Sequence, residues 1–191
     1  DTIRSYAEAV VAFLDAVGIE QAVVAGHSMG GATAMTMALD FQDHVAGLVL
    51  VATGARLRVA PAILEGIRSD FEGAVEVITR FAWSPQAKPA LTELGRRALL
   101  ETGPDVLFGD FAACDRFDVM ERLGEIETPT LVIAGTADQL TPPKYAHFLA
   151  EHIAGAHLTI IEGAGHMVML EQPVEVAKAA GEFLEKKVPP P

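Results

Sequence analysis

The chain has 191 residues and a formal net charge of -12, from 26 Asp and Glu against 14 Lys and Arg. Such an acidic balance argues against nucleic acid or an anionic membrane surface as a partner, because both require clustered basic side chains. Half of the residues are hydrophobic, enough for the core of one domain, and no apolar run reaches the ~20 residues of a membrane helix.

The N-terminal part predicts a helix that leads into a βαβ unit. Asp1 or Thr2 is suited to begin the helix. Residues 21–28 are a short β-branched run, apolar on both faces, which is typical of a buried strand in a parallel sheet. Residues 29–41 return to a helical pattern, and residues 45–53 predict a second buried strand. Apolar side chains recur at helical spacing in the first helix: Ile3, Ala7, Val10, Leu14 and Val17.

The strand pattern stops between about residues 56 and 127. Residues 60–83, 92–101 and 104–117 have helical patterns, and Pro104 suits a first helical turn. The segment therefore predicts a helical insertion between two strands. We expect most of its large side chains to pack internally and one or two to line an apolar pocket. These side chains are Phe71, Phe81, Trp83, Leu107, Phe108, Phe111 and Phe117.

The last third returns to alternating strands and helices. A third strand is predicted at 129–138, a helix from Thr141 to about Ile153, a fourth strand at 157–166, and a final amphipathic helix that ends at Pro189–Pro191. The fold class is therefore α/β, a mostly parallel sheet flanked by helices. The chain reads as one domain over residues 1–191, with the helical insertion at 56–127.

The stretch Gly26-His27-Ser28-Met29-Gly30 matches G-x-S-x-G at the junction of the first strand and the next helix. A sharp turn there holds the serine in a strained backbone conformation, and residues 26 and 30 crowd each other unless they lack side chains. We expect Ser28 to be a nucleophile and the Met29 N–H to donate to a developing oxyanion. His27 is expected to have a structural role.

A serine hydroxyl needs a neighbouring base, and that base needs a fixed tautomer. In open α/β sheets, functional groups gather beyond the carboxyl ends of the strands. The third and fourth predicted strands end at Asp138 and His166, which gives the chain order Ser, Asp, His. Asp138 is favoured as the acid because the segment after the second strand has no carboxylate. Asp115 and Asp118 read as surface charges or helix caps.

These motifs resemble those of the α/β-hydrolase family, in particular its small esterases and lactonases. The resemblance rests on "GHSMGG", "LVIAGTADQLTP" and "EGAGHMVMLEQPVEV" and extends from residue 1 to about 187. It implies that Ser28, Asp138 and His166 form a catalytic triad and that Met29 is a backbone oxyanion donor. It also implies that the insertion at 56–127 is a cap.

One departure from the family pattern concerns the sheet. The family's sheet has eight strands and this sequence supplies four, without the segment that donates the second oxyanion N–H. Loss of one such donor costs about 10²–10³ in rate. The first strand is expected to have an unpaired apolar edge, so we expect a longer polypeptide or a partner, such as a second copy, to cover it.

The favoured function is a serine hydrolase that cleaves small carboxylic esters through an acyl-enzyme. The same triad also serves lactone opening, C–C bond hydrolysis or perhydrolysis, and sequence does not separate these reactions. A ligand-binding module and an inactive fragment that lacks half of the oxyanion hole are further alternatives. Nucleotide binding is disfavoured, since "GHSMGG" lacks the lysine of a phosphate loop.

The remaining expectations concern cofactors and location. The single cysteine, Cys114, cannot form an intramolecular disulfide, which favours a reducing, cytoplasmic compartment. Its thiol reads as a small core side chain. The six histidines lack the spacing of a zinc site, and the mechanism requires no cofactor. The expected partner is a small apolar ester or lactone.

Overall fold

A computed structural model describes residues 2–188 of the chain. Two predictions fall outside the described residues. They are Asp1 as a candidate to begin the first helix, and Pro189–Pro191 as the end of the last helix. Thr2 is the N-cap of α1 (Ile3–Ala16): its hydroxyl oxygen accepts from the Ser5 N–H at 3.1 Å. No helix within residues 2–188 has the length and apolar character needed to cross a membrane.

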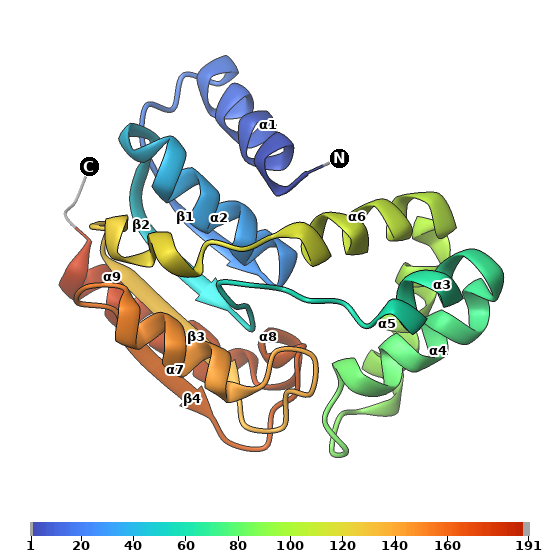
Figure 1. The fold of residues 1–191 in the computed structure, drawn as a ribbon. Helices are drawn as coiled ribbons and strands as arrows, with labels where there is room; N and C mark the ends of the chain where they lie inside the picture. The colour runs from blue at the N-terminus through green and yellow to red at the C-terminus, as the bar shows by residue number, and fades with distance from the viewer. Residues whose placement is uncertain (1, 189–191) are drawn as a thin grey trace.

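The four described strands form one parallel sheet in the order β1-β2-β3-β4 (Figure 1). Central strands β2 and β3 are almost wholly buried, as predicted. Strand β1 is only partly buried, so the prediction of a buried first strand is wrong. The physical reason is that its outer edge pairs with no strand within residues 2–188, and this unpaired edge is as predicted. The strands are β1 (Ala22–His27), β2 (Val45–Val51), β3 (Thr130–Gly135) and β4 (His157–Ile161).

Helices cover both faces of the sheet because side chains alternate along each strand. On one face, Leu48 and Leu50 of β2 pack in a cluster with α1, α2 (Met29–Asp40) and α7 (Pro143–His152). On the other face, Val49 and Val51 pack in a cluster that includes Phe183 of α9 (Pro173–Lys187). The predicted α/β class is therefore confirmed.

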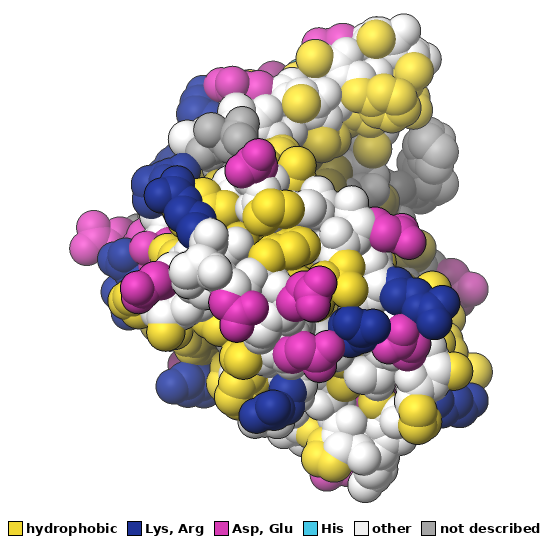
Figure 2. Space-filling model, turned by 90° about the vertical axis from the view of Figure 1, so that its right-hand side faces the viewer, with side chains coloured by type: hydrophobic (Ala, Val, Ile, Leu, Met, Phe, Trp, Pro, Cys, Tyr) yellow, Lys and Arg dark blue, Asp and Glu magenta, His cyan; other side chains and the backbone are white. Residues whose placement is uncertain are grey.

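The helical insertion lies to one side of the sheet and has its own apolar cluster (Figure 1). It comprises α3 (Pro61–Ser69), α4 (Phe71–Ala82), α5 (Pro89–Thr102) and α6 (Pro104–Arg116). The helical pattern over 60–83 is divided at Asp70, whose carboxylate accepts from the Gly73 N–H and begins α4. Figure 2 shows acidic and basic side chains interspersed on this side of the molecule. One ion pair of α5 joins Arg96 Nε to Glu93 Oε2 at 2.9 Å.

The two ends of the insertion meet beside the sheet. Arg56 and Asp118 form an antiparallel bridge, and the Val119 N–H donates to the Ala55 carbonyl at 2.8 Å. After the bridge, a 3₁₀ helix (Met120–Glu125) leads the chain to β3. Another 3₁₀ helix (Gln42–His44) connects α2 to β2. Paired ends hold the insertion over the carboxyl ends of the strands, where functional groups gather.

Candidate active site

Ser28 lies in the turn between β1 and α2 and has a strained backbone, with φ 52° and ψ -115°. A Cβ added to Gly26 would lie 2.1 Å from the Gly30 carbonyl oxygen, so no side chain fits there. The predicted crowding is therefore confirmed at Gly26, whereas a Cβ added to Gly30 would have no atom within 4 Å. A non-glycine residue at positive φ persists only where its surroundings hold it.

Strand β2 and the loop after it supply that support. The Ser28 N–H donates to the Val51 carbonyl at 2.9 Å, and the Thr53 hydroxyl donates to the Ser28 carbonyl at 2.7 Å. The Gly31 N–H of α2 donates to the same carbonyl at 2.9 Å. The backbone groups on both sides of the Ser28 side chain are thus bonded, while the side chain faces a cavity.

Asp138 and His166 form a buried pair in the loops after β3 and β4. Asp138 Oδ2 lies 3.0 Å from His166 Nδ1, and each residue is 4% exposed. Asp138 Oδ1 accepts from the N–H groups of Leu140 and Thr141, both at 2.9 Å. Strands β3 and β4 end at Gly135 and Ile161, earlier than the predicted ends at Asp138 and His166. Loops rather than strand ends therefore place the two side chains.

Thr141 completes this pair and was not identified from sequence as a site residue. Its hydroxyl donates to Asp138 Oδ2 at 2.8 Å, and its oxygen lies 3.1 Å from His166 Nδ1. Asp138 Oδ2 can only accept, and the Thr141 hydroxyl already donates its proton to that oxygen, so the proton of the neutral His166 ring resides on Nδ1. Nε2 is then the unprotonated nitrogen and the basic one.

His27 contacts the back of the His166 loop. Its Nε2–H donates to the His166 carbonyl at 2.9 Å, and the two ring centroids are 4.7 Å apart. Burial, followed by the nearby His166, lowers the pKa of His27 from the usual 6.5 to about 4. His27 is therefore a neutral ring that holds the loop, in agreement with the predicted structural role.

Glu171 ties the His166 loop to the insertion. It ends the short helix α8 (Val168–Glu171), and its two carboxylate oxygens accept from the N–H groups of Gly165 at 3.1 Å and Ser84 at 3.2 Å. The Met167 N–H donates to the Ala82 carbonyl at 3.2 Å. The loop that carries His166 and the end of α4 therefore form one bonded unit.

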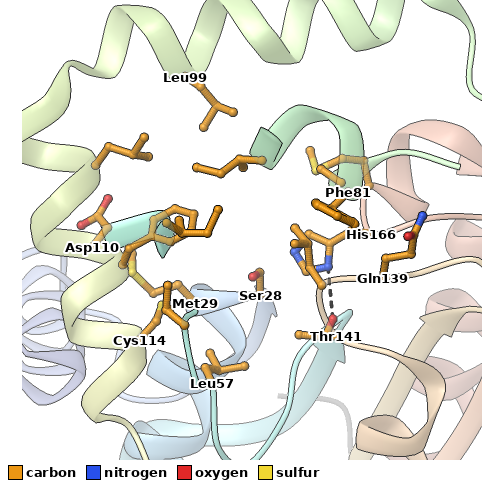
Figure 3. A pocket seen from close by; sticks show the side chains of 18 of the residues that line it. Ser28, Met29, Leu57, Phe81, Leu99, Asp110, Cys114, Gln139, Thr141 and His166 are labelled. Carbon is orange, nitrogen blue, oxygen red and sulfur yellow. Dashed lines mark hydrogen bonds between the residues drawn. The ribbon is translucent and has the colours of Figure 1, made fainter. Parts of the chain in front are cut away.

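Ser28 and His166 line the same cavity, about 690 Å³ in volume, between the sheet and the insertion (Figure 3). That volume is typical of a small-molecule site. Within residues 2–188, no hydrogen bond joins the Ser28 hydroxyl to His166. Met29 begins α2 beside them, so its N–H has no intrahelical acceptor.

The insertion contributes more large side chains to the cavity than the one or two expected. Of the seven side chains named in the prediction, four line it: Phe81, Trp83, Leu107 and Phe111. The others pack elsewhere, Phe71 and Phe108 in the cluster of the insertion and Phe117 in the main core. Periodicity identifies an apolar side chain but does not distinguish a core position from a cavity wall.

The rival groups have local roles. Asp115 accepts from the Val59 N–H, and Asp118 accepts from the Met120 N–H beside its ion pair with Arg56. Cys114 lines the cavity, but burial and then Asp110 raise the pKa of its thiol to about 12. A thiol with that pKa is a poor nucleophile near neutral pH. Within residues 2–188, no three His, Cys, Asp or Glu side chains are grouped to hold a metal ion.

The lowered pKa of His27 predicts a pH-dependent stability. Between about pH 6.5 and pH 4 the unfolded chain binds a proton at this residue and the folded chain does not, so acid favours unfolding. We expect the free energy of unfolding to fall by up to about 3 kcal/mol across this window because of His27 alone.

Urea unfolding at several pH values measures this effect. His27→Asn should flatten the loss of stability between pH 6.5 and pH 4, whereas the matched variant of an exposed histidine, His147→Asn, should retain the wild-type slope. Equal slopes in the two variants would contradict the assignment of a neutral, buried His27.

Comparison with known proteins gives a consistent result. Residues 1–179 match the model of the alpha/beta hydrolase family. The chain is 29% identical to the 2-hydroxy-6-oxo-6-phenylhexa-2,4-dienoate hydrolase of Comamonas testosteroni, over 95% of this chain and 68% of that protein. It is 28% identical to the 3-oxoadipate enol-lactonase 2 of Acinetobacter baylyi, over 86% of this chain and 64% of that protein.

A solved structure described as a thermophilic esterase is 43% identical to this chain, with a TM-score of 0.91 over 97% of this chain and 74% of that one. The chain thus spans about two thirds of the length of the two curated relatives and three quarters of this structure. The predicted fold class and the prediction of a hydrolase are confirmed. The chain belongs to the alpha/beta hydrolase family.

Proposed function

We propose that this chain cleaves small carboxylic esters through a covalent acyl-enzyme, with Ser28 as nucleophile, His166 as base and Asp138 as the group that orients His166. The observation that carries the proposal is the buried 3.0 Å contact of Asp138 with His166, at a cavity that the strained Ser28 also lines. A serine in such a turn, with an oriented histidine at the same cavity, is suited to acyl transfer.

The proposed reaction begins when the Ser28 oxygen attacks the ester carbonyl and His166 Nε2 accepts the hydroxyl proton. Asp138 stabilises the imidazolium that forms. The Met29 N–H donates to the oxyanion, helped by the positive end of α2. The family resemblance implies a second oxyanion N–H, which this proposal assigns to no residue of the chain.

Collapse of the tetrahedral intermediate releases the alcohol, which takes its proton from His166. Water then attacks the acyl-enzyme, and His166 again serves as the base. In this proposal the insertion at 56–127 acts as a cap: its apolar side chains bind the substrate and keep bulk water from the reacting carbonyl. The chemistry uses side chains and backbone N–H groups alone.

Lactone opening is the second candidate, and the similarity to an enol-lactonase favours it. A lactone is a cyclic ester, so Ser28, His166 and Asp138 would perform the same steps and the leaving alcohol would stay attached to the acyl group. The shape of the cavity decides between open and cyclic esters. Turnover of a matched pair of an open ester and a lactone distinguishes the two.

The first experiment measures hydrolysis of p-nitrophenyl esters of short and long acids by the wild type and by Ser28→Ala. Loss of the nucleophile should reduce kcat by at least about 10³-fold. Ser69→Ala, an exposed serine of α3 outside the cavity, is the matched control and should retain wild-type turnover. Equal hydrolysis by wild type and Ser28→Ala would refute the mechanism.

A second prediction concerns Thr141. Thr141→Val keeps the shape of the side chain but removes the hydroxyl that binds Asp138, so kcat/KM should fall about 10-fold, the usual worth of one hydrogen bond to a charged group. Thr141→Ser restores the hydroxyl and should restore most of the rate. If valine and serine behave alike, the hydroxyl does not position the Asp138–His166 pair.

A further inference from the structure

Few charged groups line the cavity that holds Ser28 and His166. Its walls are otherwise apolar or neutral, apart from Asp110 on α6 and Arg58 in the segment after β2. His27 is neutral above its lowered pKa of about 4. A charged substrate in this cavity therefore interacts electrostatically mainly with the Asp110 carboxylate and the Arg58 guanidinium.

Asp110 is a half-buried carboxylate on the α6 side of the cavity (Figure 3). Its Oδ1 accepts from the Tyr6 hydroxyl of α1 at 2.6 Å. Among residues 2–188, no lysine or arginine forms an ion pair with Asp110, and Oδ2 accepts no hydrogen bond. Its carboxylate is thus held in place by a neutral donor and, as far as residues 2–188 show, forms no ion pair.

The charge of Asp110 acts on both of its polar neighbours. The pKa of Tyr6 is raised to about 12, first by its hydrogen bond to Asp110 and then by burial. The pKa of the Cys114 thiol, one helical turn along α6, is also raised to about 12, first by burial and then by Asp110. Repulsion by the Asp110 charge is a smaller contribution to both shifts, and a second negative charge placed at this wall would meet that repulsion too.

Arg58 does not offset this charge. Its side chain is exposed, and its guanidinium already donates to the Asp115 carbonyl at 3.1 Å. An exposed cation is screened by water and salt and contributes little binding energy. The half-buried carboxylate of Asp110, in the wall of a mostly apolar cavity, acts at lower dielectric and with less screening.

We infer that the cavity selects esters or lactones that carry no negative charge, and that Asp110 binds an ammonium or another hydrogen-bond donor at the far end of the substrate. This inference rests on the proposed ester hydrolase function. Asp110 Oδ2 is the acceptor for that donor. A substrate carboxylate would lie in an apolar cavity beside a like charge, and both effects oppose its binding.

Three p-nitrophenyl esters of similar acyl length test the inference: heptanoate (neutral), 6-ammoniohexanoate (cationic) and the adipate monoester (anionic). For the wild type near pH 7, kcat/KM for the cationic ester should exceed that for the anionic ester by about 10-fold or more. The wild-type ratio needs no variant, so a ratio of one or below overturns the inference directly.

Variants then assign the preference to one residue. Asp110→Asn should reduce the cationic-to-anionic ratio by about 10-fold, because the amide keeps the shape and removes the charge. Asp105→Asn, an exposed change of equal charge on the same helix, should keep the wild-type ratio. Tyr6→Phe removes the hydroxyl that donates to Asp110 but leaves the charge of Asp110 in place. The cationic-to-anionic ratio should therefore stay above one in this variant.

The outcomes separate this inference from the proposed function. If the neutral ester is hydrolysed no faster by the wild type than by Ser28→Ala, the proposed function fails. If the neutral ester is hydrolysed but Asp110→Asn and Asp105→Asn give the same ratio, the role of Asp110 fails while the hydrolase mechanism stands.

Discussion

The close approach of two backbone segments at Ser28 is the constraint on which the site depends. Gly26 and Gly30 lie so near each other that a Cβ on Gly26 would overlap the carbonyl of Gly30, and Ser28 between them has a positive φ. Bonds from Val51 and Thr53 hold this conformation. The parallel pairing of β1 with β2 places Val51 and Thr53 beside Ser28. The backbone conformation of Ser28 therefore depends on the register of these two strands.

Parallel strands explain how residues far apart in sequence share one cavity. Every strand of the sheet ends on the same edge, so the loops after β1, β3 and β4 bring Ser28, Asp138 and His166 together. Each loop is then tied down by its own contacts. Thr141 bonds to Asp138, His27 bonds to the His166 carbonyl, and Glu171 binds that loop to the insertion.

Local pattern was sufficient for the order of strands and helices along the chain, for the helical insertion and for the candidates Ser28, Asp138 and His166. These features depend on period-2 and period-3.6 apolar patterns and on a turn whose glycines are visible in sequence. Thr53 and Asp110 were not identified as site residues, because their partners Ser28 and Tyr6 are distant in the chain. Thr141 was expected to begin a helix, and its contact with Asp138, three residues away, depends on the conformation of the loop between them. Strand ends were placed up to five residues too late, since apolar loop residues such as Ala164 continue the pattern of β4 but pack outside the strand.

Covalent labelling tests the central claim most directly, that Ser28 is a nucleophile activated by the Asp138–His166 pair. The folded protein would be treated with a fluorophosphonate, analysed by intact mass spectrometry and mapped by peptide sequencing. The account predicts one adduct per chain, at Ser28, absent in Ser28→Ala and formed far more slowly in His166→Gln. A folded wild-type protein that takes no label, or that is labelled at another residue, would contradict it.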